Sequence, residues 1–344
     1  MTDEVQAHRS RANIDDVALA AGVSTATVSR ALRGHPYVAE ATRQRIERIA
    51  EDLHYVANAN AARLASGQSR TIGLLAPLLT SWYTSEIVAG VEEILALAQY
   101  DLLIGTANAT ARERIFRGDA RFKQRIDGAI LVDVFCSEEG ARHLSQMDAP
   151  VVVLGEELIS VTSVSVDNAN GARLAARHLI DLGHRRIAVV GGHGNIEVAH
   201  NVPTERLEGF RDALSAAGLD LPSEYVEDGE FTIEGGRRAM QRFLALPQPP
   251  TAVFLMSDEM AYGAMWALRD AGLQVGRDVS IVGFDDHTVA ESVGLTTVGQ
   301  NVREIGRIGA RLMLAALDGS GEIGHHPVEL ALVERSTTGA PPNP

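Results

Sequence analysis

From residue 70 onward, the chain consists of short apolar runs that alternate with helix-length segments. Runs such as TIGLLAPL, GAILVDV, PVVVLG, RRIAVVGG, TAVFLM and VSIVGFDD are bounded by glycine, proline or charged residues. Uninterrupted apolar strands of this kind are typical of parallel strands that are buried on both faces of a sheet. Because the pattern occurs in two consecutive series, it predicts an α/β domain of two doubly wound parallel-sheet lobes. Such lobes hold ligands at the carboxyl ends of their strands, in the cleft between them.

The first seventy residues follow a helical pattern instead. Asn13 is suited to cap a first helix, and Asp16 stands three residues later, as the acid of a capping box does. Gly22 stands where the chain must leave that helix with a positive φ angle. Ser24 is suited to cap a second helix, which we expect to run from Thr25 to about Leu32.

The two short helices have the spacing of a helix-turn-helix. Ala18, Gly22 and Val28 fall where small or inward-facing residues let two helices cross closely. A generic helical hairpin is the alternative interpretation. A third helix is expected over residues 40–53, with an apolar stripe formed by Ile46, Ile49, Ala50 and Leu53.

Charge is distributed unevenly over the 344 residues, whose formal net charge is −14. Residues 1–70 contain nine arginines and eight acidic residues, which leaves 22 basic and 37 acidic residues for the rest of the chain. Binding to random DNA depends on positive charge, so an almost neutral N-terminal unit would bind it weakly. Tight binding of such a unit to DNA would depend on well-placed contacts. Cys136 is the only cysteine, no apolar run approaches the roughly 18 residues of a membrane span, and residues 1–10 lack the apolar core of a secretory signal. We therefore expect a cytoplasmic protein without a membrane partner.

The order and spacing of these segments resemble the LacI family of bacterial transcriptional regulators. IDDVALAAGVSTATVSRALRG, ATRQRI, L-H-Y and N-x-x-A-x-R-L-A-S-G precede RTIGLLAP in the family's order. HLIDLGHRRIAVVGG, ERLEGFRDAL, SDEMAYGAMWAL, SIVGFDD and LTTVGQN match family blocks farther along, so the resemblance covers about residues 13–335. It implies an all-α helix-turn-helix headpiece and an effector domain that is similar to periplasmic sugar-binding proteins.

The resemblance also implies the domain organisation. The headpiece is expected at residues 1–57, a hinge helix or linker at 58–69, and the effector-binding and dimerisation domain at 70–340. Because the family's chain crosses back between the lobes, each lobe is expected to be discontinuous. The expected bounds are about 70–167 and 300–325 for the first lobe, and about 168–299 and 326–340 for the second.

The family's DNA contacts map onto the second helix. By resemblance, Thr25, Ala26 and Arg30 face base edges in the major groove, where arginine can bind guanine through two hydrogen bonds and alanine offers a methyl contact to thymine. Contacts to phosphate are then expected from Ser24, Thr27 and Ser29.

The segment ANAARLAS corresponds to the family's hinge helix. The resemblance assigns DNA contacts to Asn58 and Arg63, and a wedge between base pairs in the minor groove to Leu64. A bland linker is the alternative. The chain departs from the family pattern at Ala57, which replaces a proline, at Ala39, which replaces a capping serine, and in the placement of Arg63 directly before Leu64.

Candidate effector-binding residues come from strand ends. Asp285 is the first acid after VSIVGF and is placed to accept hydrogen bonds from ligand hydroxyls, and Asp133, at the end of GAILV, is a further candidate. Ser257 follows TAVFLM at a position where the family more often has asparagine. Arg206 begins the ERLEGF helix, and its family counterpart contacts the effector.

An aromatic pair lies in the loop after the first strand, where the family more often has N-P-F-F. Trp82 and Tyr83 are candidates to stack on a sugar ring or a base, with packing in the core as the alternative for each.

These features predict a repressor that binds pseudo-palindromic operator DNA as a homodimer, under the control of a small effector. A sugar is the expected effector, and a nucleoside or purine is the alternative. An enzyme is the competing class of protein, but HExxH, GxSxG and Walker patterns are absent, and the eleven histidines show no metal-ligand spacing. We therefore expect no catalytic residues, metal or cofactor. The sequence leaves open whether the effector releases or strengthens DNA binding, and which operator is bound.

Overall fold

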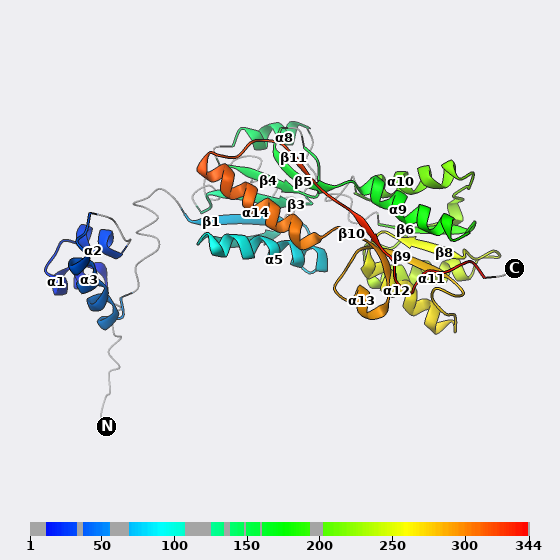
Figure 1. The fold of residues 1–344 in the computed structure, drawn as a ribbon, viewed down its shortest axis with the longest axis horizontal. Coiled ribbons are helices and arrows are strands. Elements are labelled where there is room, and N and C mark those ends of the chain that lie inside the picture. The colour runs from blue at the N-terminus through cyan, green and yellow to red at the C-terminus, as the bar shows by residue number, and fades with distance from the viewer. Residues whose placement is uncertain are drawn as a thin grey trace, which may run out of the picture. The chain divides into compact units, whose positions relative to one another are not determined.

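The computed structural model of the protein comprises two compact units, Met1–Ser69 and Arg70–Pro344, which are considered one at a time (Figure 1). Among the residues that the structure describes, no helix is both long enough and apolar enough to cross a membrane. The residues that the structure describes are 12–32, 37–55, 69–106, 125–133, 138–147, 149–158, 160–192 and 202–342.

The N-terminal unit contains the three predicted helices, α1 (Ile14–Ala21), α2 (Thr25–Leu32) and α3 (Glu40–Asp52). The predicted capping box is confirmed: the Asn13 side chain accepts hydrogen bonds from the backbone of Asp15 and Asp16, and the Asp16 carboxylate accepts the Asn13 backbone N–H at 2.8 Å. Gly22 ends α1 with φ 63°, as predicted. These local contacts fix where the first helix begins and ends.

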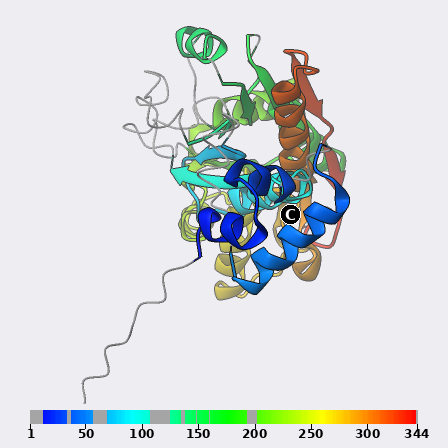
Figure 2. The same ribbon diagram turned by 90° about the vertical axis from the view of Figure 1, so that its left-hand side faces the viewer.

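Small and branched apolar side chains form the core among the three helices, which pack together in Figure 2. Val17, Val28 and Ile46 are fully buried there. The prediction that Leu53 joins this core is wrong: α3 ends at Asp52, and Leu53, the residue that follows it, is 38% exposed.

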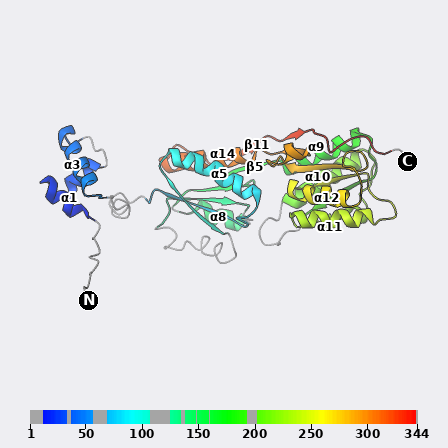
Figure 3. The same ribbon diagram turned by 90° about the horizontal axis from the view of Figure 1, so that it is seen from below.

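The first lobe of the larger unit is a parallel sheet covered on both faces. Its strands have the order β11-β5-β4-β3-β1-β2, and each described pair is parallel. Figure 3 shows α5 (Trp82–Leu97) and α14 (Val302–Asp318) side by side along one face, with α8 (Glu138–Ser145) on the other. The strands are β1 (Thr71–Ala76), β2 (Asp101–Thr106), β3 (Gly128–Val132), β4 (Val151–Leu154), β5 (Thr162–Val166) and β11 (His325–Val328).

Alternate residues of each strand supply separate cores on the two faces of the first sheet. Ile72 and Leu74 pack with residues of α5 and α14, whereas Leu75 belongs to a second cluster that includes Leu144 of α8. Burial on both faces explains why β1, β3 and β4 have almost wholly apolar sequences.

The second lobe repeats this arrangement. Its strands have the order β12-β10-β9-β8-β6-β7, in which β12 is antiparallel to β10. The helices α9 and α10 pack together, as do α11 and α12. A short helix α13 (Ala290–Val293) follows β9, and a 3-10 turn (Ser223–Tyr225) precedes β7. The other elements are α9 (Asn168–Asp181), β6 (Ile187–Gly191), α10 (Val202–Ala216), β7 (Val226–Asp228), α11 (Ile233–Leu244), β8 (Ala252–Leu255), α12 (Asp258–Asp270), β9 (Ser280–Asp285), β10 (Thr296–Gly299) and β12 (Ala331–Val333).

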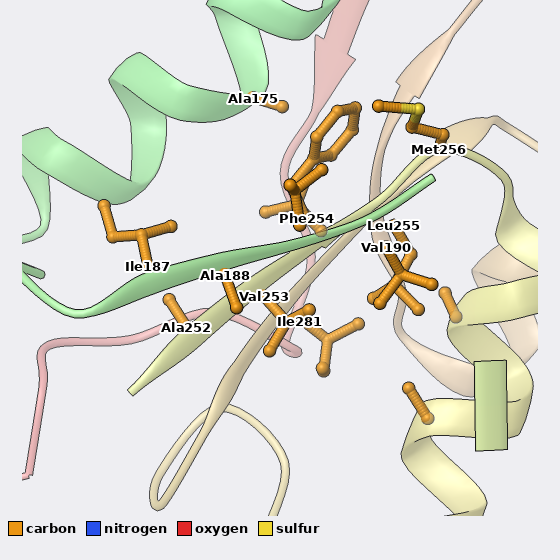
Figure 4. Packing of buried hydrophobic residues seen from close by; sticks show 14 of the residues in the cluster. Ala175, Ile187, Ala188, Val190, Ala252, Val253, Phe254, Leu255, Met256 and Ile281 are labelled. Atoms are coloured by element: carbon orange, nitrogen blue, oxygen red, sulfur yellow. The ribbon is translucent and has the colours of Figure 1, made fainter. Parts of the chain in front are cut away.

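The core of the second lobe also lies on both faces of its sheet. In Figure 4, Phe254 of β8 points toward the side where Ala175 of α9 lies, and Val253 and Leu255 point to the other face. All four side chains are fully buried.

The described chain passes between the lobes three times, after β5, after β10 and after β11. The expected start of the second lobe's last segment at residue 326 is wrong, because residues 325–328 pair with β5 in the first sheet. The chain reaches the second lobe only at β12, which pairs with β10. The strand β5 was not predicted from the sequence.

The left-handed backbone of Gly22 generates a prediction for the stability of the N-terminal unit. An added Cβ meets no atom within 4 Å, so Gly22→Ala costs only the strain of φ 63°, about 1 kcal/mol. Amide protection in α1 and α2, measured by hydrogen exchange in the full chain, should fall about fivefold. Gly22→Asn should lose less, because asparagine tolerates this conformation. Unchanged protection in both variants would contradict the assignment of strain.

Candidate effector pocket and DNA-reading helix

A cavity lies between the two lobes at the carboxyl ends of their strands. Its empty space, including the part open to solvent, is about 900 Å³. Five of the six predicted effector-binding residues line it, with Tyr83 and Asp133 from the first lobe and Arg206, Ser257 and Asp285 from the second. Strand ends from both lobes therefore meet at one site.

The guanidinium of Arg206 is held in a fixed position. Arg206 is 5% exposed, and its Nε donates to Asn168 Oδ1 at 2.9 Å while Nη1 donates to the Met256 carbonyl at 2.6 Å. Its Cζ lies 3.6 Å from the centroid of the Phe284 ring. Burial lowers the pKa of Arg206, and the negative charge of Asp285 opposes that shift. The side chain thus enters the cavity as an oriented hydrogen-bond donor.

Asp285 ends β9 with an unusual backbone conformation, at φ 125°. Such strained conformations cluster at binding sites, where the surrounding structure holds them. The Gln300 side chain donates to Asp285 Oδ1. Burial raises the pKa of Asp285 to about 7, although the charge of Arg206 and the bond from Gln300 act in the opposite direction.

Asp133 follows β3 and faces the same cavity from the first lobe. Its φ angle of 47° is left-handed, and its carboxylate lies against Gly155, where an added Cβ would stand 2.0 Å from Oδ1. Gly155 is therefore needed to leave space for this carboxylate. Burial raises the pKa of Asp133 to about 7, and the charge of Arg206 opposes this shift.

Tyr83 and Ser257 complete the predicted set in the cavity. Burial raises the pKa of the Tyr83 phenol well above its usual value, and the charge of Asp133 adds to that effect. Ser257 accepts a hydrogen bond from the Met260 backbone at 3.3 Å and so caps α12. Ser257 therefore has a structural role as well as a place in the lining.

Trp82 does not line the cavity. Its ring stacks on His287 of the second lobe, with centroids 4.5 Å apart, and Tyr262 approaches His287 edge-on at 5.4 Å. The Trp82 indole N–H is buried without a hydrogen-bond partner in the described structure. Trp82 thus makes an aromatic packing contact between the lobes. Its environment is that of the alternative interpretation, packing, and not of stacking on a ligand in the cavity.

Two polar residues that form hydrogen bonds with Arg206 and Asp285 were not predicted from the sequence. Asn168 lies where the chain enters the second lobe after β5, and Gln300 lies where it leaves that lobe after β10. Both line the cavity. Their place at the ends of strands was the signal available for finding them, since Gln300 belongs to the block LTTVGQN.

In the N-terminal unit, Ala26 and Arg30 are both exposed and lie one turn apart on α2. Thr25, Thr27 and Ser29 are partly buried, and exposed Ser24 accepts the Thr27 backbone N–H at 3.2 Å. Ser24 therefore caps α2, as expected. The predicted hinge contacts fall outside the described residues; they are Asn58, Arg63 and Leu64.

The raised pKa of Asp133 generates a prediction about stability and pH. Because this pKa rises from 3.8 to about 7 on folding, the folded protein binds the extra proton, and ionisation of Asp133 lowers stability as pH rises from about 4 to 7. Asp133→Asn removes this loss, and asparagine suits the left-handed backbone. The variant should gain up to about 4 kcal/mol relative to the parent between pH 4 and pH 8, measured by denaturant unfolding. The exposed Asp220→Asn should show no such gain, and parallel pH profiles for parent and Asp133→Asn would contradict the assignment.

Comparisons with known proteins agree with both units. Residues 13–58 match the family described as bacterial regulatory proteins, lacI family, and residues 176–338 match a periplasmic binding protein-like domain. The HTH-type transcriptional repressor CytR of Escherichia coli K12 is 36% identical over 338 residues, which are 96% of this chain and 97% of that protein.

Solved structures share the whole architecture. The Lac repressor dimer bound to operator and the anti-inducer ONPF has a TM-score of 0.86 and 27% identity, and the match covers 96% of this chain and 100% of that one. The transcriptional regulator CelR in complex with cellobiose has a TM-score of 0.67 and 31% identity, with 95% and 100% covered. The chain therefore belongs to the LacI family of bacterial regulatory proteins.

Proposed function

We propose that this regulator represses transcription as a homodimer on a pseudo-palindromic operator, and that a small polyhydroxylated effector in the inter-lobe cavity sets its affinity for DNA. The observation that carries the proposal is the presence of Arg206 and Asp285 in one cavity, each oriented by a second residue. The relatives with known roles are regulators, and we assign no catalytic step to the cavity.

The DNA-reading surface is proposed on α2. Exposed Arg30 and Ala26 offer the side chains that distinguish base edges in the major groove, while Thr25, Thr27 and Ser29 stand beside them. Ser24 fixes the start of the helix and so its direction. Operator DNA lies in the bacterial cytoplasm, which is where we propose that the protein acts.

The chemistry of the cavity favours a ligand with several neighbouring hydroxyl groups. The Asp285 and Asp133 carboxyls accept hydrogen bonds, Arg206 donates them, and Tyr83 adds an aromatic surface with a hydroxyl. A sugar fits this set, and the CelR relative was solved with cellobiose. A nucleoside or purine is the second candidate, because Tyr83 and Phe231 both line the cavity and offer rings for stacking on a base.

Ligand binding is coupled to lobe movement through Asn168 and Gln300. Arg206 is bonded to Asn168 at the first crossing of the chain between the lobes, and Asp285 is bonded to Gln300 at the second. A ligand that draws Arg206 and Asp285 toward Asp133 therefore changes contacts at both crossings. Because each lobe arrangement has its own affinity for DNA, the effector and operator affect each other's binding.

The dimer is proposed from the size of the DNA-reading unit and from exposed apolar residues. A single headpiece buries too little surface for specific recognition of an operator. In the first lobe, Leu97 at the end of α5 is 85% exposed and Ile104 on β2 is 43% exposed. The homologous Lac repressor was solved as a dimer on its operator.

The proposal as a whole is tested in two steps. Selection from random DNA duplexes should yield a sequence with two related half-sites, and light scattering should show two chains on it. A thermal-shift screen of sugars and nucleosides should then yield a stabilising ligand, since a ligand at 100 times its Kd adds roughly 2.7 kcal/mol. Recovery of single half-sites bound by one chain would contradict the dimer.

Arg30→Ala tests the DNA-reading surface. Loss of a contact to a base should cost about 1–3 kcal/mol on the selected operator and relax the preference at one base position, with little change on random DNA. Gel-shift titrations of both DNAs measure this. Arg211→Ala, on an exposed site of α10, is the matched control and should bind like the parent. An equal loss on both DNAs would show that Arg30 contacts phosphate instead.

Asp285→Asn and Arg206→Gln test the effector site. Each substitution removes a charge-assisted hydrogen bond, and effector affinity in calorimetric titration should fall about ten- to a hundredfold. Operator binding without effector should remain. If both variants bind effector as the parent does, the two residues have a structural role only.

A further inference from the structure

Acidic side chains outnumber basic ones in the described lining of the cavity. Asp133, Glu259 and Asp285 are acidic, and Arg206 is the single basic residue among the described residues that line the cavity. Asp133 and Asp285 come from opposite lobes, so a ligand held between the lobes lies between two carboxyl groups. Glu259, which is half-buried at the start of α12, adds a third on the side of the second lobe.

Arg206 is already engaged within the protein. Two of its N–H groups are bonded to Asn168 and to the Met256 carbonyl, and one face of the guanidinium is covered by the Phe284 ring. The negative charges of Asp285, Asp133 and Glu205 favour the charged form of Arg206, Asp285 most strongly. An anionic group of a ligand would compete with these carboxylates for the Arg206 guanidinium. It would also lie beside acidic side chains, and the described lining contains no second basic residue to offset the repulsion.

We propose that the pocket distinguishes the uncharged form of its effector from the phosphorylated form, and that the regulator responds to the former alone. This inference rests on the proposed function, because it assigns a charge class to the effector of the same site. A phosphate group carries up to two negative charges at neutral pH, and like charges brought together at a binding site cost several kcal/mol in affinity, a loss of at least about a hundredfold.

The selectivity gives the effector a place in a reaction sequence. A phosphotransferase that moves a phosphoryl group from a nucleoside triphosphate to an effector hydroxyl forms the phosphate ester and releases a nucleoside diphosphate and the hydroxyl proton. The phosphate ester adds negative charge, which the acidic side chains of the pocket repel. Phosphorylation of the effector therefore ends the signal, and the regulator reports the amount of ligand that has not yet been phosphorylated.

The experiment compares matched pairs by calorimetric titration of the full-length protein. The pairs are ribose and ribose 5-phosphate, glucose and glucose 6-phosphate, adenosine and adenosine 5′-monophosphate, and cytidine and cytidine 5′-monophosphate. The uncharged member of at least one pair should bind, with its phosphate ester at least about 100-fold weaker. Inorganic phosphate should not stabilise the protein beyond chloride of equal ionic strength.

The outcomes separate this inference from the proposed function. If a phosphate ester binds as tightly as its uncharged partner or tighter, the pocket is an effector site but the inference on charge is wrong. If every uncharged member fails to bind, the proposed effector class fails, and the inference fails with it.

Removal of a lining charge provides a second measurement. At pH 8, above the Asp133 pKa of about 7, Asp133→Asn should narrow the affinity gap between the uncharged and phosphorylated members by about tenfold, because one like charge is gone. The ratio of the affinities for the uncharged and phosphorylated members is informative even if the substitution changes both affinities. Asp220→Asn is the control, because Asp220 is exposed and does not line the cavity, and it should leave the ratio of the two affinities unchanged. An unaltered ratio in Asp133→Asn would overturn the electrostatic basis of the selectivity.

Discussion

The buried guanidinium of Arg206 is the constraint on which the pocket depends. A charge removed from water is costly unless other groups compensate it, and here an amide oxygen, a carbonyl, an aromatic face and two nearby carboxyls do so. These partners come from several elements of both lobes, so the ends of several strands must meet for the charge to be accommodated. The two carboxyls in turn tolerate burial because Arg206 lies beside them, and the opposing effects leave each with a pKa of about 7.

A second set of contacts links the lobes beside the cavity. His287 contacts the rings of both Trp82 and Tyr262, its backbone N–H donates to Asp258 at 2.8 Å, and its Nδ1 accepts the Val289 N–H. Burial lowers the pKa of His287, which favours the uncharged ring, whose Nδ1 accepts this hydrogen bond. The aromatic contact and the ligand site thus use adjacent residues, since Tyr83 faces the cavity and Trp82 faces His287.

Local signals in the sequence were sufficient for the boundaries of α1. Asn13 and Gly22 act on backbone groups within a few residues, so their roles follow directly from spacing. The strand β5 was missed because three of its five residues, in TSVSV, carry hydroxyl side chains, unlike the apolar runs used to find strands. Ser163 is nevertheless fully buried and accepts a hydrogen bond from the Leu158 backbone. Nothing in a short window indicates that such a hydroxyl has a partner in the core.

The candidate site was predictable to the extent that it depends on strand ends. Asp285 and Asp133 follow apolar strands, and the topology alone brings them to one cavity. The sequence did not show which member of the pair Trp82 and Tyr83 faces that cavity, because adjacent residues on a helix point about 100° apart. The partners of Arg206 and Asp285 were also hidden, since Asn168 lies 38 residues from one and Gln300 15 residues from the other.

The repeated passage of the chain between the lobes has a consequence for synthesis on the ribosome. The first lobe lacks α14 and β11 until about residue 328 has been made, although its first strand begins at residue 71. The apolar face of α5 therefore has no partner helix from its own lobe during most of translation. The N-terminal unit, whose helices α1 to α3 all lie within residues 14–52, is free to fold early, whereas the lobe that follows it is completed almost last. A chain that ends prematurely before α14 thus carries a finished DNA-reading unit joined to a lobe that cannot close its core.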